Sequence, residues 1–340
     1  MGILLHVIFM EKNKGERTML SILNKLSKFD YEKIKESIVS LATPFVDEIW
    51  TDKLGNLICH KKGTGAKIMF SAHMDIIGLI VTHIDEKGYI YVSKIGGVRP
   101  ENILHTKVCF VNGTVGTVSN LVGCNEKLTM DDIFVDIGAN SREEAAKKVS
   151  VGDIAYYNGE IVETENMIIS PYLDDKIGCF ILLKAMEQMK NNKNDLYFVF
   201  TVQEEVGLHG ARTAAFSIAP DYGIAVDVTC TDDIPGSKHN FTTQLGNGAA
   251  IKVMDGSVLC HDFVVKKLKE IANEKGIQHQ VDIMCVGGTD AGPIHVSRDG
   301  VVTGGITIPC RYIHSPNEMV SKSDVEKCIE LAVAFSESDL

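Results

Sequence analysis

The stretch "FTVQEEVGLHGAR", residues 200–212, begins as a strand and ends in two neighbouring carboxylates, Glu204 and Glu205. Residues 197–200 are all apolar or aromatic, and two glycines follow the acidic pair. This pattern predicts a buried strand that stops in a loop. Charges at the end of a buried strand are costly unless a positive group neutralises them. We therefore expect an internal sheet in which this strand end faces a cationic partner.

Strand and helix patterns alternate on both sides of this stretch. Strand patterns occur at residues 55–62, 66–75, 195–202, 222–228, 277–284 and 301–308, and helix patterns at 19–40, 176–190, 210–218, 261–276 and 323–335. Alternation with near-continuous apolar strands is typical of a sheet covered by helices on both faces. We therefore predict an α/β domain built on such a sheet.

Residues 77–165 have a different character, with short β runs separated by glycine turns. One helix interrupts them, with Ser141 as its N-cap and Glu144 completing a capping box. Such a pattern is typical of a small β-rich module. We predict that this module is a β-barrel-like domain inserted into one α/β domain, which is made of residues 19–76 and 166–340.

The composition is that of a soluble globular protein. The chain has 340 residues, of which 45% are hydrophobic and 23% charged. Its net charge of −11 argues against non-specific binding to nucleic acid or to an anionic membrane, because both require a basic face. The nine cysteines are scattered, and none forms a Cys-x-x-Cys pair. This usage argues against disulfides or a cysteine zinc site and favours a cytoplasmic location.

The first ten residues, "MGILLHVIFM", are apolar but too short to cross a bilayer. They also lack the basic region and the cleavage site of a signal peptide. We therefore predict that residues 1–18 are a dispensable N-terminal extension and that Met19 opens the folded domain.

Histidine and acidic side chains recur where the predicted elements end or begin. They are His73 and Asp75, Asp174 and Asp175, Glu204 and Glu205, Asp227, and His314. A lone histidine at a strand end is more often structural, and adjacent acidic residues are common at helix starts. As a group, however, they interrupt apolar strands at the end where a ligand crevice forms. Carboxylate and imidazole ligands without cysteine predict a hydrolytic zinc, cobalt or manganese site.

A two-metal hydrolytic site divides its carboxylates between two tasks. Metals about 3.5 Å apart share a bridging carboxylate, while another carboxylate stays off the metals to deprotonate the bridging water. Glu204 and Glu205 fit this division, because neighbours at a fraying strand end reach one cavity from different sides. Asp75, two residues after His73, is placed to hold the other imidazole nitrogen.

Several further motifs follow one another in the chain. They are "DKLGNLI" from residue 52, "AHMD", "IGG", "DIGANSREEA", "DDKIG", "FTVQEEVGLHGA", "AVDVT", "GGTDAG" and "IPCRYIHSP". With these motifs the chain resembles the tetrahedral-type aminopeptidases of metallopeptidase family 42, which are often called glutamyl aminopeptidases and sometimes endoglucanases. The resemblance implies a helix-covered mixed sheet of the zinc-peptidase type with an inserted β-barrel-like domain.

The resemblance also implies roles for the residues of the site. Asp174 would bridge two divalent ions, zinc or cobalt, with manganese as the alternative. His73 and Asp227 would complete one ion's site, and Glu205 and His314 the other. Glu204 would be the catalytic base and Asp75 would orient His73. The peptide bond between Asp174 and Asp175 is expected to be cis, and Thr289, Asp290 and Arg311 are candidate substrate-binding residues.

Self-association also follows from the resemblance. The inserted domain would form dimers, and the dimers would assemble into a tetrahedral dodecamer. The sequence departs from the family at three places. Ile76 replaces a glutamate, Lys176 replaces an arginine, and "SNLVGCNEKL" replaces a proline-histidine stretch of the inserted domain. The first departure bears on substrate preference and the third on assembly.

These observations predict a dinuclear metal-dependent aminopeptidase that removes N-terminal residues from short peptides, with a metal-bridging water activated by Glu204. An N-acyl amino acid deacylase or amidohydrolase could use the same metals. A glycosidase fits less well, because it needs two opposed carboxylates without histidine ligands, and the single tryptophan, Trp50, lies far from the motifs. A non-catalytic assembly protein is disfavoured, because all the expected ligands and the base are present.

Overall fold

This computed structural model describes residues 17–123, 127–238 and 240–340. Its large sheet has eleven strands. Its order is β1-β2-β12-β3-β13-β16-β17-β11-β10, with β14 paired to β16 and β15 to β14. The bounds are β1 Glu48–Thr51, β2 Leu57–Lys61, β3 Lys67–His73, β10 Val162–Glu163, β11 Met167–Ser170, β12 Asp195–Thr201, β13 Tyr222–Cys230, β14 Ala249–Met254, β15 His279–Ile283, β16 Val302–Arg311 and β17 Glu318–Ser321. The adjacent strands β12, β3, β13 and β16 are parallel, whereas β2, β14 and β17 join them antiparallel. The predicted mixed sheet is confirmed.

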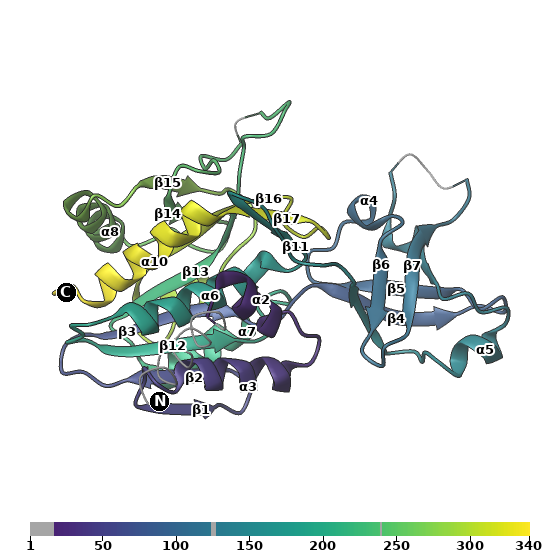
Figure 1. Ribbon diagram of the computed structural model, residues 1–340, viewed down its shortest axis with the longest axis horizontal. Coiled ribbons are helices and arrows are strands. Elements are labelled where there is room, and N and C mark those ends of the chain that lie inside the picture. The colour runs from purple at the N-terminus through teal and green to yellow at the C-terminus, as the bar shows by residue number, and fades with distance from the viewer. Residues whose placement is uncertain (1–16, 124–126, 239) are drawn as a thin grey trace, which may run out of the picture.

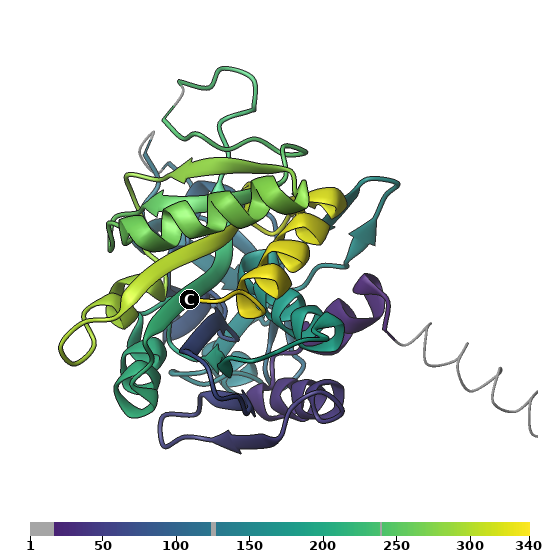
Figure 2. The same ribbon diagram turned by 90° about the vertical axis from the view of Figure 1, so that its left-hand side faces the viewer.

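Helices cover both faces of this sheet (Figures 1 and 2). They are α2 Met19–Leu26, α3 Tyr31–Ala42, α6 Leu173–Gln188, α7 His209–Ile218, α8 Asp262–Lys275, α9 Ala291–His295 and α10 Lys322–Ser336. Side chains on a strand alternate between faces. Accordingly Phe70 packs into a core with α6 and α10, while its neighbour Met69 packs into a separate core with α7 and α9.

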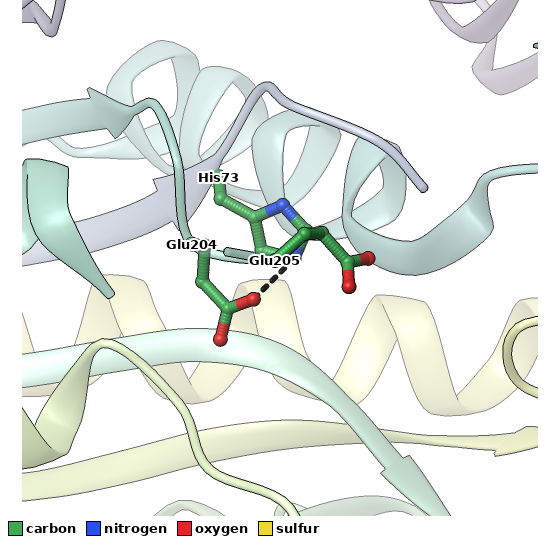
Figure 3. A group of neighbouring side chains, drawn as sticks. All are labelled: His73, Glu204 and Glu205. Atoms are coloured by element: carbon green, nitrogen blue, oxygen red, sulfur yellow. Dashed lines mark ion pairs between the residues drawn. The ribbon is translucent and has the colours of Figure 1, made fainter. Parts of the chain in front are cut away.

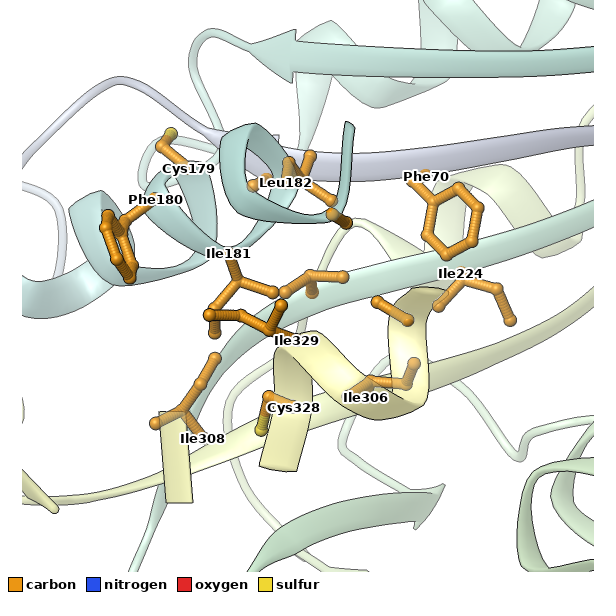
Figure 4. Close-up of a cluster of buried hydrophobic side chains, with 14 of the residues drawn as sticks. Phe70, Cys179, Phe180, Ile181, Leu182, Ile224, Ile306, Ile308, Cys328 and Ile329 are labelled. Carbon is orange, nitrogen blue, oxygen red and sulfur yellow. The ribbon is translucent and has the colours of Figure 1, made fainter. Parts of the chain in front are cut away.

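The larger core is built on aromatic and branched side chains (Figure 4). Phe70 stacks on Phe198 of the neighbouring strand with ring centroids 5.4 Å apart, and the ring of Phe335 meets Phe70 edge-on at 6.3 Å. Helix α6 is apolar on nearly all sides, so it lies buried between the sheet and α10. These contacts fix the strand ends that carry the site residues.

A second, smaller sheet closes into a barrel beside the first (Figure 1). Its strands are β4 Gly78–Ile84, β5 Ile90–Ile95, β6 Lys107–Phe110, β7 Val115–Asn120, β8 Ile133–Asp136 and β9 Ile154–Tyr157, closed in the order β4-β5-β8-β7-β6-β9. Short helices α4 Pro100–Ile103, η1 Met130–Asp132 and α5 Arg142–Ala146 join the strands. The barrel has its own apolar core, which includes Leu79, Val108 and Val135. The predicted barrel-like insertion into an α/β fold is confirmed, and β10, within the predicted range of the insert, pairs with β11 of the large sheet.

Some local expectations need correction. Arg17 and Thr18 fall within the predicted extension of residues 1–18, yet both belong to the fold. The guanidinium of Arg17 donates to the Leu41 carbonyl (3.2 Å) and lies 3.3 Å from the Glu187 carboxylate, and the Thr18 hydroxyl caps α2. Residues 1–16, the rest of that extension, lie outside the described residues.

The predicted capping box of α5 is also offset by one residue. Ser141 accepts from the Glu144 N–H as expected (3.2 Å), but the Glu144 carboxylate accepts from the N–H of Asn140 (2.9 Å) rather than from Ser141. Strands β1, β8, β10, β11, β14 and β17 were missed in the sequence. Within the described ranges, no helix is both long and apolar enough to span a membrane.

Candidate metal centre

The site lies at one edge of the large sheet, where the parallel strands end. His73 is the last residue of β3, and Thr201, its partner across the ladder, ends β12 just before the acidic pair. Asp227 lies near the end of β13, and His314 follows the end of β16. Because parallel strands end at the same edge, the side chains converge there, as the spacing of the motifs predicted.

Asp174 lies between two histidines. Its Oδ1 is 2.9 Å from His73 Nε2, and its Oδ2 is 3.1 Å from His314 Nε2. The peptide bond that follows Asp174 is cis, as expected from the resemblance. Burial opposes ionisation of this carboxyl, but the hydrogen bonds from His314 and His73 hold its pKa below the usual range. Each carboxylate oxygen of Asp174 therefore contacts a different imidazole.

Glu204 and Glu205 diverge from one another, as Figure 3 shows. The Oε2 of Glu204 lies 3.8 Å from His73 Nε2, whereas the Oε2 of Glu205 lies 3.3 Å from His314 Nε2. Glu204 therefore approaches the imidazole that contacts Oδ1 of Asp174, and Glu205 approaches the imidazole that contacts Oδ2. This is the arrangement that a fraying strand end makes accessible.

Asp75 acts differently from the sequence expectation. Its carboxylate Oδ1 is 3.7 Å from His73 Nδ1, beyond hydrogen-bond distance, whereas its backbone carbonyl lies 3.0 Å from that nitrogen. The carboxylate instead accepts the backbone N–H groups of Glu204 and Glu205, both at 3.1 Å. Asp75 therefore positions the acidic pair through its side chain and the imidazole through its main chain.

Three overlapping groups of side chains are close enough to share an ion. They are His73 with Glu204 and Glu205, His73 with Asp175 and Asp227, and Asp174 with Glu205 and His314. The last group is one of the two ligand sets that the resemblance implies. Asp227 approaches His73 together with Asp175, whose carboxylate also accepts the His73 N–H (3.1 Å).

The electrostatics of the group call for positive charge. Burial raises the pKa of Glu204, of Asp227 and of Glu205 above their usual ranges, with neighbouring carboxylates adding to the effect. Burial works against a charged His314, yet Asp174 and Glu205 raise its pKa to about 11. The Oε1 of Glu205 is buried and has no hydrogen-bond partner among the described residues. Oxygen and imidazole donors crowded in this way fit divalent cations.

Glu318, at the start of β17, was not singled out in the sequence. It is 1% exposed, and its carboxylate accepts the N–H of Asp174 (2.9 Å) with one oxygen and the N–H of His314 (2.8 Å) with the other. A glutamate after a "HSPN" turn gives no sequence signal for this role, because the pairing depends on the tertiary fold.

A cavity of about 650 Å³ opens over the centre. Apolar side chains of Leu208, Val228, Met284, Val286 and Ile313 line it, together with Asp174, Glu204, Glu205, Asp227 and His314 of the centre. The barrel contributes Lys94, Gly97, Val98 and Arg99. Ile76, one of the departures from the family, is buried in the core of the barrel and does not line this cavity.

The three candidate substrate-binding residues have other partners and do not line the cavity. Thr289 donates to Asp255 (2.9 Å), and Asp290 accepts from the Thr201 hydroxyl (2.7 Å), both deep in the interior. Arg311 forms a bidentate pair with Asp233 at 2.9 and 2.7 Å. In this structure their contacts are internal.

Comparison with known proteins bears on the identity of the fold and site. A family model described as M42 glutamyl aminopeptidase matches residues 55–331. A putative aminopeptidase of Acetivibrio thermocellus is 46% identical over 325 residues, covering 94% of this chain and 98% of that protein. The lysyl aminopeptidase of Pyrococcus furiosus is 36% identical over 330 residues, covering 92% and 93%.

A solved structure of the Pyrococcus horikoshii TET1 peptidase has a TM-score of 0.83 at 29% identity. The match covers 94% of this chain and 99% of that chain. That peptidase can assemble into a tetrahedron or a large octahedral shell. The family model and both relatives extend over most of the sequence, through the large sheet and the barrel alike. The chain therefore belongs to the M42 glutamyl aminopeptidase family.

Proposed function

We propose that this protein is a dinuclear metal-dependent aminopeptidase that removes N-terminal residues from short peptides. The observation that carries the proposal is the placement of Asp174, which presents one oxygen to His73 and the other to His314. A carboxylate in that position is suited to bridge two ions. Asp227 would complete the His73 side and Glu205 the His314 side.

Two divalent ions, zinc or cobalt with manganese as the alternative, would polarise the scissile carbonyl and lower the pKa of the attacking water. Glu204 takes the proton from that water on its carboxylate and passes it to the nitrogen of the leaving amine. Burial raises the pKa of Glu204, with His73 opposing, and a raised pKa makes the carboxylate a better base. Asp75 holds Glu204 in place through the backbone N–H.

The surrounding cavity supports a substrate with a free amino terminus. Four carboxylate side chains line its floor and would attract an ammonium group. The apolar side chains of Leu208, Met284 and Val286 offer contact to an uncharged side chain. An N-acylated substrate would bring no cation to these carboxylates, which favours the aminopeptidase over the deacylase.

The test is hydrolysis of a panel of aminoacyl p-nitroanilides by chelated protein and by protein reconstituted with zinc or cobalt. N-acetylated versions of the same substrates are assayed alongside. We expect metal-dependent cleavage of the free-amine substrates only. Cleavage of the blocked substrates would replace the proposal with a deacylase or endopeptidase, and no cleavage with two ions bound would refute the substrate class.

We further propose that the barrel mediates self-association and that dimers build a larger shell, as the Pyrococcus horikoshii TET1 peptidase does. Large apolar side chains stand exposed on the barrel, namely Val111, Val115, Leu121, Val122 and Val151. Exposed apolar side chains of this size contribute to a protein interface where they form a contiguous patch. Light scattering of the full chain, compared with a Val111→Lys, Val151→Lys variant, tests this role through the mass of the assembly.

A further inference from the structure

Two basic side chains of the cavity have no role in the proposed centre. Lys94 belongs to β5, and Arg99 precedes α4, so both come from the barrel, yet both line the cavity of the large domain. Most of the other polar lining belongs to the ion site. These two cations therefore require a separate explanation.

Neither side chain has a counterion within residues 17–123, 127–238 and 240–340. No carboxylate of the described residues lies within ion-pair distance of Lys94 or Arg99, and neither side chain donates a hydrogen bond within that part of the chain. By contrast, Arg311 binds Asp233, and Lys252 lies 2.8 Å from Asp282. Lys94 and Arg99 are thus exposed and available to a ligand that enters the cavity.

Close packing brings this segment against the centre. A Cβ on Gly97 would lie 2.2 Å from His314 Nδ1, and one on Gly96 would lie 2.9 Å from Glu205 Oε2, so both positions accept only glycine without displacement. Arg99 follows two residues later. Arg99 lines the same cavity as Cys230 and His314.

Acidic and basic side chains occupy different parts of the cavity lining. The acidic residues are Asp174, Glu204, Glu205 and Asp227, which belong to the proposed centre on the floor. Lys94 and Arg99 come from the barrel and place positive charge at the wall. A substrate that supplies an amino group to the floor and a carboxylate to this wall would match both.

We propose that Lys94 and Arg99 form a subsite for a substrate carboxylate located beyond the scissile bond. The carboxylate is either the C-terminus of a di- or tripeptide or an acidic side chain after the first residue. The inference rests on the proposed aminopeptidase function and specifies its substrate class as short or acidic peptides. Arginine suits this task because its guanidinium pairs with carboxylate in a bidentate geometry.

The experiment uses the metal-loaded full chain and matched peptides. Leu-Ala-Ala is compared with its C-terminal amide, and Leu-Glu-Ala-amide with Leu-Gln-Ala-amide. We expect wild-type kcat/KM to be roughly fivefold higher for at least one carboxylate-bearing member, mainly through KM, because partly exposed ion pairs contribute modestly. The first pair identifies the C-terminus as the source and the second identifies the side chain. The preference for the carboxylate-bearing peptide should decrease as the salt concentration rises, because salt screens exposed charges.

The Lys94→Gln, Arg99→Gln variant should lose this preference while it hydrolyses the neutral member of each pair at a nearly unchanged rate. Lys107→Gln, which neutralises an exposed barrel lysine outside the cavity, is the matched control and should retain the preference. Equal wild-type rates for both members of both pairs, or an equal loss on both in the variant, would overturn the subsite. Failure to cleave any free-amine peptide would instead refute the proposed function.

Discussion

The carboxylate of Glu318 accepts the backbone N–H of Asp174 at 2.9 Å, and its second oxygen accepts the N–H of His314 at 2.8 Å. One buried side chain therefore holds the main chain of two proposed ion ligands that lie far apart in the sequence. Burial and the nearby Asp174 raise the pKa of Glu318, while the two N–H donors oppose this effect. The geometry makes Glu318 a positioning residue for the centre.

We expect Glu318→Gln to weaken ion binding at the group of Asp174, Glu205 and His314. The glutamine amide has one acceptor oxygen for the two N–H donors, and its NH₂ group faces the second donor. Either Asp174 or His314 therefore loses the hydrogen bond that holds its backbone N–H. Losses of about 10- to 100-fold in ion affinity are typical of such changes. Calorimetric titration of chelated protein with zinc measures the change in ion affinity. The exposed Glu326→Gln in α10 is the control, and equal affinities in both variants would exclude the role.

Replacing Glu204 by glutamine should separate catalysis from ion binding. The amide keeps the size of the side chain but cannot accept the proton of the water, so kcat should fall by about 10²–10⁴ or more. Because Glu205, rather than Glu204, faces His314, the variant should still bind two ions per subunit. Metal analysis after desalting checks this point. Appreciable turnover, or loss of an ion together with activity, would contradict the assignment of roles.

Ion removal should destabilise the fold. The carboxylates of the centre are buried beside one another, so without ions they repel and remain poorly solvated. Binding at an ion concentration 100-fold above the dissociation constant adds about 2.7 kcal/mol to the free energy of unfolding. Thermal unfolding of chelated and zinc-loaded protein measures the difference. Asp174→Asn should lose most of the response, whereas Asp136→Asn, on an exposed part of the barrel, should keep it.

The convergence of the strand-end side chains could be predicted from the sequence, whereas the residues that hold those side chains in place could not. The residues at the strand ends, from His73 to His314, could be identified because apolar strands that stop at charged side chains have a recognisable pattern. The family resemblance, and the mixed sheet with its inserted barrel, were likewise confirmed. Glu318 and the carboxylate contacts of Asp75 could not be predicted, because they accept backbone N–H groups that only the tertiary fold brings near. The motif around Thr289 and Asp290 pointed to substrate, but the structure turns both side chains inward.

The burial of Asp290 predicts a specific pH dependence of the free energy of unfolding. Burial raises its pKa to about 6, whereas an unfolded aspartate titrates near pH ~3.9. The native state therefore binds this proton more tightly, so its contribution to stability is lost as pH rises from about 4 to 6. Asp290→Asn carries no charge, and it should raise the free energy of unfolding of chelated protein at pH 8 by about 2–3 kcal/mol.

The gain from Asp290→Asn should disappear as pH falls to 4. Denaturant unfolding at both pH values measures it, and the exposed Asp299→Asn serves as control. An equal change at pH 4 and pH 8 would show that packing, rather than charge, determines the effect.

Gly97, in the barrel, lies directly against His314 of the proposed centre. A Cβ there would lie 2.2 Å from Nδ1 and 2.3 Å from Cε1 of His314, so an alanine must displace the imidazole. The His314 backbone has little freedom to follow, because Glu318 holds its N–H and its φ is +63°. Gly97→Ala should therefore weaken the ion on the Glu205 side by roughly 10- to 100-fold and leave the ion near His73 in place. Native mass spectrometry with limiting zinc counts the ions directly.

The control for this variant is Gly159→Ala, whose Cβ would lie 3.1 Å from the Pro171 ring and 3.8 Å from the Pro316 carbonyl oxygen, away from the ion ligands. It should bind both ions as the wild type does and keep full activity. If Gly97→Ala also binds two ions with wild-type affinity, the barrel segment can retreat from His314, and the close approach places no constraint on the centre. Loss of one ion in Gly97→Ala alone would instead show that the position of the barrel sets the geometry of a ligand in the other domain.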